Sequence, residues 1–141
     1  EYIIKDGDVL FSWSGTLEVE LWCGGEGALN QHLFKVTSEK YKKWFYYFWT
    51  KHHLDSFRSI AASKATTMGH IQRSHLTEAK VVVPSIELLS AANNIFTPLV
   101  DSIQRNALHA KTLEGIRDML LPKLVLGQLE VNDIQLEKQI A

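Results

Sequence analysis

The sequence has a single cysteine, Cys23, and only three prolines in 141 residues. One cysteine excludes a disulfide within the chain and any metal site of the CxxC type, and it fits a protein of the reducing cytoplasm. No apolar run reaches the roughly 18 residues that span a bilayer, and the first residues do not resemble a secretion leader. The chain begins at Glu1 without methionine, so we expect further structure upstream.

Motifs for catalysis and nucleotide binding are also lacking. No GxxxxGK[ST] or GxGxxG pattern occurs, so nothing indicates a bound nucleotide. His52 and His53 are adjacent, and on a helix they point about 100° apart and cannot share one metal ion. Four residues have the chemistry of a nucleophile, base or acid: Cys23, His32, Glu26 and Asp8. They follow no known catalytic spacing, so we expect a structural cysteine, no enzymatic activity, no cofactor and no metal in this chain.

Positive and negative charges are nearly balanced overall, but the positive charge is concentrated in one third of the chain. The net charge is −1, yet between Lys35 and Lys80 nine basic residues stand against three acidic ones. The flanking segments are both acidic. Such a local field steers a polyanion toward one face of a protein, whatever the net charge. The alternative is an ordinary solvated lysine face on a helix.

The hydrophobic pattern predicts a mixed α/β (α+β) domain with a small antiparallel sheet. Strands are expected over residues 9–13, 17–22, 29–36 and 76–83, the last closed by Pro84. A helix over residues 39–62, capped by Thr37 or Ser38, lacks glycine and proline, and its six consecutive rings from Trp44 to Trp49 predict that it is mostly buried. Residues 63–74, rich in small hydroxylated and basic side chains, are expected to form a presented loop.

Residues 85–126 show a period of 3.6 and predict one long helix. Pro98 inside it predicts a kink or a break at that point. The spacing of five residues follows a heptad: Leu99, Ile103, Asn106, Ala110 and Leu113. A polar residue on such a seam, here Asn106, fixes the register of a coiled coil. The alternative is a helix packed entirely on its own domain, but about 40 residues extend further than so small a domain.

Four segments resemble a known family in their order along the chain. These are GDVLFSWSG at 7–15, ALNQHLF at 28–34, ATTMGHI at 65–71 and LLPKL at 120–124. Together with the long helix they resemble the specificity subunit of type I restriction-modification enzymes. The resemblance implies two target recognition domains, each followed by a conserved helix, with the two helices paired antiparallel between the halves of a split DNA site. It also implies that methylation and cleavage, with S-adenosylmethionine, ATP and magnesium, belong to other subunits.

On this resemblance residues 1–84 are part of a target recognition domain, 85–126 the conserved helix and 127–141 a C-terminal tail. The implied partners are double-stranded DNA, the methyltransferase and restriction subunits, and a second copy of this chain that pairs through the helix. The residues expected to contact DNA are Arg58, Lys64, Thr66, Thr67, His70, Arg73, Ser12 and Trp13. Half of the side chains at this strand end point inward, so for Trp13 a place in the core is favoured over DNA contact. A second hypothesis is a helical-arm assembly module that binds protein instead of DNA.

Overall fold

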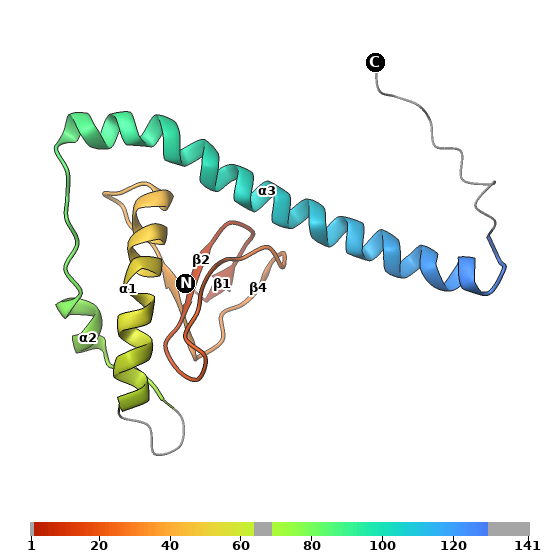
Figure 1. Ribbon diagram of the computed structural model, residues 1–141, viewed down its shortest axis with the longest axis horizontal. Helices are drawn as coiled ribbons and strands as arrows, with labels where there is room; N and C mark the ends of the chain where they lie inside the picture. The colour runs from red at the N-terminus through yellow and green to blue at the C-terminus, as the bar shows by residue number, and fades with distance from the viewer. Residues whose placement is uncertain (1, 64–68, 130–141) are drawn as a thin grey trace. The chain divides into compact units, whose positions relative to one another are not determined.

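The computed structural model describes residues 2–63 and 69–129. The chain divides into two compact units, residues 1–105 and residues 106–141. The first unit has the predicted α+β character, with a three-stranded antiparallel sheet in the order β3-β2-β5 (Figure 1). Its strands are β2 (Val9–Ser12), β3 (Val19–Leu21) and β5 (Leu33–Val36). A separate antiparallel pair, β1 (Ile3–Ile4) and β4 (Gly27–Ala28), was not predicted from the sequence.

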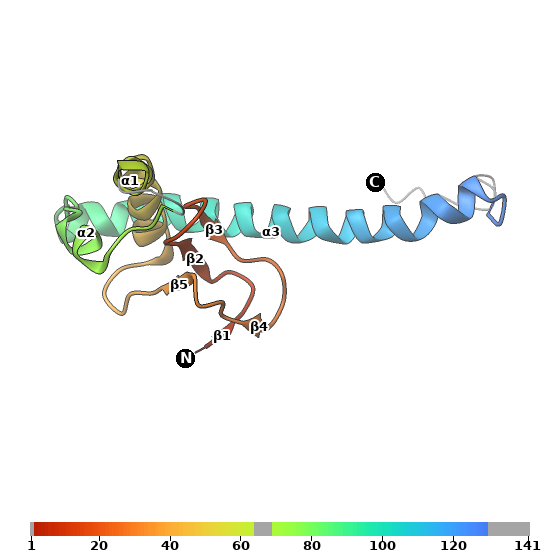
Figure 2. The ribbon, with the colours of Figure 1, turned by 90° about the horizontal axis from the view of Figure 1, so that it is seen from below.

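The core of the first unit lies between the sheet and a helix. Val9 and Phe11 alternate along β2 and share one face, and each is 1% exposed. Helix α1 (Lys43–Ser63) covers this face, and Phe57 from the helix packs on Phe11 with ring centroids 5.7 Å apart. Figure 2 shows α1 on one side of the sheet and the β1–β4 pair on the other. Both faces of β2 are therefore covered, which agrees with the burial of Leu10.

Helix α1 begins four residues later than predicted. Ser38 is therefore not the cap of α1: its Oγ accepts the backbone N–H groups of Lys40 and Tyr41 at 3.2 and 3.0 Å and closes a turn ahead of the helix. The prediction that the ring residues are buried is wrong for Phe48, which is 37% exposed. The buried side chains of α1 are Phe45, Tyr47, Leu54, Phe57 and Ala61. Six consecutive rings on a helix point in all directions, so they cannot all face one sheet.

The predicted strand over residues 76–83 is wrong. A short helix, α2 (Arg73–Glu78), occupies its first half. The backbone N–H of Gln72 donates to Nδ1 of His75 at 3.0 Å, and this local bond favours a helical turn over a strand. Three valines follow α2 in extended backbone, and Val82 is 73% exposed. Their apolar run predicted a strand from β-propensity alone, which tertiary context overrides here.

The long helix α3 (Ile86–Val125) is continuous through Pro98, so the expected break does not occur. Its ribbon bends in its first third, as the alternative prediction of a kink had it (Figure 1). Packing on both sides of the proline holds this part of the helix. Phe96 stacks on Trp44 of α1 with ring centroids 5.0 Å apart, and Val100 is 1% exposed in the core. The indole N–H of Trp44 also donates to Oδ1 of Asn93 at 2.6 Å.

The second unit is described from residue 106 to residue 129 and contains the rest of α3. Several of its large apolar side chains are exposed, namely Leu113, Ile116, Met119, Leu121, Val125 and Leu126. Gly127 follows the helix with a φ of +65°, a conformation that glycine adopts without strain at the end of a helix.

Candidate nucleic-acid interface

The turn after β2 is joined to the segment that follows α1. Ser14 and His70 form an antiparallel bridge, the backbone N–H of Gly15 donates to the carbonyl of Gly69 at 3.0 Å, and that of Ile71 donates to the carbonyl of Trp13 at 3.1 Å. Gly15 has a φ of +69°, which allows the chain to reverse directly after this contact. Three predicted contact residues, Ser12, Trp13 and His70, are thus brought to one end of the sheet.

A second turn, residues 30–32, lies against the same strand end. The backbone N–H of Trp13 donates to the carbonyl of His32 at 3.2 Å, and its indole N–H donates to the carbonyl of Gln31 at 3.2 Å. Ser14 Oγ lies 2.9 Å from Nδ1 of His32. The result is a polar surface, here called the strand-end platform, formed by Trp13, Ser14, Asn30, Gln31, His32 and His70. All except Trp13 and Ser14 are exposed.

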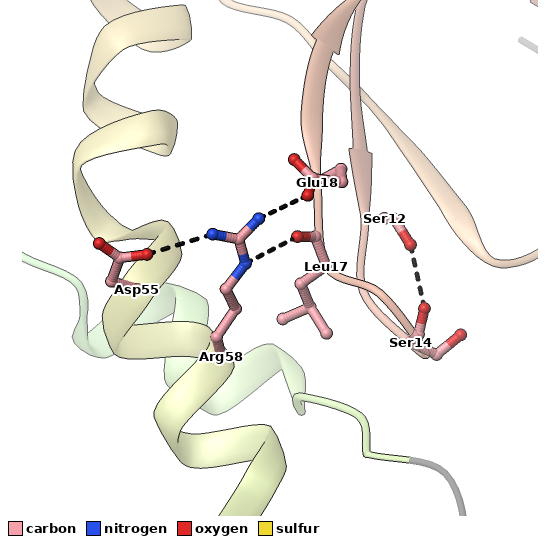
Figure 3. A network of polar contacts seen from close by, with 6 residues as sticks. All are labelled: Ser12, Ser14, Leu17, Glu18, Asp55 and Arg58. Carbon is pink, nitrogen blue, oxygen red and sulfur yellow. Dashed lines mark hydrogen bonds and ion pairs between the residues drawn. The ribbon is translucent and has the colours of Figure 1, made fainter.

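Ser12 and Trp13 support the platform from within. Ser12 Oγ donates to the carbonyl of Ser14 at 3.0 Å, which stabilises the turn (Figure 3). The half-buried Trp13 ring lies 6.1 Å from Phe34, 5.7 Å from His32 and 6.5 Å from His70 between ring centroids. This agrees with the core role weighed for Trp13, since the ring joins the sheet to the polar surface.

Arg58 ties α1 to the hairpin that carries the platform. Its Nε donates to the carbonyl of Leu17 at 3.1 Å, one terminal nitrogen pairs with Asp55 at 3.2 Å, and the other pairs with Glu18 (Figure 3). The guanidinium fork, predicted to contact DNA, is therefore engaged with this domain. Only the Leu17 contact is to a backbone carbonyl, so the fork fixes the position of the hairpin as well as balancing charge.

The other predicted contacts lie elsewhere. Lys64, Thr66 and Thr67 fall outside the described residues. Arg73 is exposed at the start of α2 and lines an apolar cleft of about 650 Å³ together with rings that include Phe34, Trp49 and Phe57. The structure thus brings Ser12, Trp13 and His70 together at the end of the sheet. Arg58 lies on α1 and Arg73 on α2.

Part of the basic segment is balanced within the domain. Nζ of Lys35 lies 2.7 Å from a carboxylate oxygen of Asp8, whereas Nζ of Lys43 lies 3.5 Å from the neutral amide oxygen of Gln104, which does not cancel its charge. Partial burial acts to raise the pKa of Asp8, but the hydrogen bonds from Lys35 and from the backbone of Lys5 outweigh burial, and the pKa is lowered. The bases with exposed positions include Lys40, Lys42 and Lys80. The positive field of this segment is weaker than its composition indicates.

Sequence reasoning missed Ser14, Asn30, Gln31 and His32 as members of the site. The prediction placed residues 29–36 in one strand, which hid the turn. A signal was present, because three polar residues in succession break the alternation of a strand. Leu33 N–H donates to the carbonyl of Asn30 at 3.0 Å and closes that turn just before β5 begins.

The predicted heptad residues are exposed in both units. In the first unit Leu99 and Ile103 are 51% and 44% exposed, and in the second unit Leu113 is 65% exposed and Asn106 and Ala110 are also exposed. Among the described residues no group of three metal-ligating side chains is found, and no helix combines the length and apolar character needed to cross a membrane.

The family of this chain follows from comparison with known proteins. Residues 1–117 match the type I restriction modification DNA specificity domain, so the chain belongs to that family. It is 31% identical over 75 residues to the type I restriction enzyme MjaIX specificity subunit of Methanocaldococcus jannaschii. This match covers 53% of the chain and 17% of that protein, so the chain spans a small part of its relative. No solved structure matches the chain.

Proposed function

We propose that this chain is a non-catalytic recognition and scaffold element that reads one half of a bipartite duplex DNA site in a type I restriction-modification complex. The observation that carries the proposal is the strand-end platform in a member of the specificity-domain family. Exposed amide and imidazole groups stand on backbone that the sheet holds firmly, and groups of this kind contact base edges and phosphates. Because the proposed target is DNA, we also propose that the chain acts in the cytoplasm.

The proposed partners involve two surfaces, the strand-end platform and the exposed apolar residues of α3. Double-stranded DNA binds the platform, together with the segment after α1, and the methyltransferase and restriction subunits supply the chemistry. The exposed apolar residues of α3 support pairing with a second helix. They are also compatible with the second hypothesis, a helical-arm assembly module that binds protein instead of DNA, although the family match favours DNA recognition.

Salt dependence separates the two functions. Duplex affinity of the purified chain is measured by fluorescence anisotropy from about 50 to 200 mM salt, a range over which several phosphate contacts cost about a thousandfold or more. We expect a steep loss, because counterions are released from DNA on binding. A protein interface made by apolar side chains shows little change over this range.

A matched pair of variants locates the DNA site. His70→Ala removes an exposed platform imidazole, and His109→Ala removes an exposed imidazole of α3 in the second unit. We expect the first variant to weaken duplex binding severalfold and the second to leave it unchanged. Equal effects, or none, would place the DNA site away from the platform.

A further inference from the structure

Asn30 and Gln31, two residues of the platform with side-chain amides, make different hydrogen bonds within the fold. Oδ1 of Asn30 accepts the backbone N–H of His32 at 2.8 Å and so closes the turn. Gln31 is exposed, and its Nε2 lies 3.3 Å from Nε2 of His32. Asn30 therefore shapes the turn, whereas the Gln31 side chain contacts His32 at the exposed surface.

The tautomer of His32 decides which Gln31 atoms face an external partner. Both contacts of the ring are satisfied when Nδ1–H donates to Ser14 Oγ, 2.9 Å away, and Nε2 accepts an N–H of Gln31. Gln31 then retains one N–H donor and the Oε1 acceptor on the same amide. Among the described residues, neither of these two groups has a hydrogen-bond partner.

The backbone beneath Gln31 is held before any ligand arrives. The indole of Trp13 donates to the Gln31 carbonyl at 3.2 Å, and the backbone N–H of Leu33 donates to the carbonyl of Asn30 at 3.0 Å. Trp13 is itself anchored by its stacking on Phe34. A turn held on both sides loses little conformational entropy on binding, which favours a specific contact over a loose one.

We infer that Gln31 is a specificity-determining residue that reads an adenine in the major groove, and that Asn30 positions it. This inference rests on the proposed function. An adjacent donor and acceptor on one planar amide match N7 and the N6 amino group of adenine, and no other base edge in the major groove presents that pair in the same order. The rings of His32 and His70 lie 5.7 and 6.5 Å from the ring of Trp13, and imidazoles in these positions can contact adjoining phosphates.

The test changes the chemistry of the amide at constant size. The full chain selects duplexes from a randomised library, and affinities are then measured for duplexes that differ at one base pair. We expect one position to prefer adenine by about tenfold or more, as a bidentate contact gives. Gln31→Ala should abolish that preference, and Gln31→Glu should transfer it to cytosine, whose N4 amino group donates to a carboxylate.

Controls separate this role from charge and from folding. Asn94→Asp introduces the same charge at an exposed position of α3, and we expect it to keep the adenine preference. Asn30→Asp retains an acceptor for the His32 N–H and should keep the preference, whereas Asn30→Ala should lose it at the position that Gln31 reads. Thermal melting of each variant reports whether the domain stays folded.

The outcomes distinguish this inference from the proposed function. If Gln31→Glu binds duplexes with unchanged preference at every position, or loses affinity equally for all sequences, Gln31 is not a base reader, and the DNA-binding function stands. If the unmodified chain shows no salt-dependent duplex binding, both the function and the inference fall.

Discussion

Arg58 shows how a residue predicted to contact DNA can serve recognition from a distance. Its bonds to Leu17 and Glu18 hold the β2–β3 hairpin against α1, while Asp55 pairs with it within the helix, and Ser14 of that hairpin belongs to the platform. The side chain is 42% exposed, so its ion pairs are screened and contribute only a few tenths of a kcal/mol each. The bond to the backbone carbonyl contributes about 1 kcal/mol more.

We expect Arg58→Ala to lower duplex affinity while the slope of log affinity against log salt stays the same. A direct phosphate contact would instead lower the slope by about one unit. A double-mutant cycle with Glu18→Gln, measured by urea denaturation and by duplex binding, checks whether the two residues act together. Asp55→Asn is the control, because the Asp55 side chain is 93% exposed.

Asp8 gives the stability of the domain a predictable dependence on pH. Its pKa in the folded state lies below the ordinary value of 3.8, because hydrogen bonds from Lys35 and Lys5 favour the carboxylate. The pairing therefore contributes its full stabilisation above the unfolded pKa, and this is lost as the pH falls through the folded pKa. We expect Asp8→Asn to destabilise the domain at pH 7, and we expect the difference from the unmodified chain to vanish as the pH falls through the folded pKa of Asp8.

Denaturation midpoints measured across that pH range test the Asp8 prediction. Asp101→Asn, at an exposed position of α3, serves as the control and should show no such convergence. A difference between Asp8→Asn and the unmodified chain that stays constant down to pH 2 would contradict the role of the Asp8 carboxylate.

At the scale of elements, only some of the aromatic rings of α1 are buried in the core. Phe57→Ala removes a ring that is 4% exposed and packs on Phe11, and we expect a loss of about 3–5 kcal/mol in the free energy of unfolding. Phe48→Ala, at 37% exposure, should cost about 1 kcal/mol. Urea denaturation of both variants measures the difference. Equal losses would mean that Phe48 is buried as deeply as Phe57.

The elements that the sequence predicted are those with strong periodic signals. The strand around Val9 and Phe11, the helix α1 and the helix α3 were all expected, because alternation and the period of 3.6 are properties of the residues themselves. The β1–β4 pair of two residues each and the turn at Asn30 were missed. The β1–β4 pair depends on partners distant in the sequence, such as the backbone hydrogen bond between Leu29 and Tyr2, whereas the turn at Asn30 is closed by local bonds.

A local hydrogen bond also helps to explain why the helix α2 forms where the sequence predicted a strand. The bond from the Gln72 N–H to His75 forms only when the backbone has turned, so it cannot be read from the sequence. The apolar run from Val81 to Val83, by contrast, predicts a strand that does not form. The same reasoning applies to Pro98. A proline inside a helix costs about 3 kcal/mol, and the packing of Phe96 and Val100 outweighs this cost. The sequence shows the cost of Pro98 in a helix, but it does not show the packing of Phe96 and Val100 that offsets this cost.

At the scale of the whole molecule, the exposed apolar residues of α3 predict self-association. Leaving side chains such as Leu113 in water forgoes about 1.5–3 kcal/mol each. We expect an antiparallel two-fold dimer at micromolar concentration, with Asn106 meeting or lying close to its copy across the axis. Light scattering measures the mass, and circular dichroism reports whether the helix is intact.

Substitutions on α3 test this dimer. Ile103→Asp and Leu113→Asp place a charge on the predicted seam and should give monomers, because a buried unpaired carboxylate opposes pairing. Thr112→Asp, an exposed position next to Leu113 and off the heptad, should leave the dimer intact. An unmodified chain that is monomeric with a fully formed helix would refute the pairing.

The junction of Gly69 with α1 has a consequence for how the domain tolerates changes in chain length. A Cβ on Gly69 would lie 3.0 Å from the carbonyl oxygen of Ala61, and the Gly69 carbonyl also accepts the N–H of Gly15, so residue 69 is held against α1 and the turn after β2. Doubling the length of a connection between fixed ends costs only about 0.6 kcal/mol. An insertion between Ser63 and Gly69 should therefore cost the domain little stability as long as these contacts of Gly69 are kept.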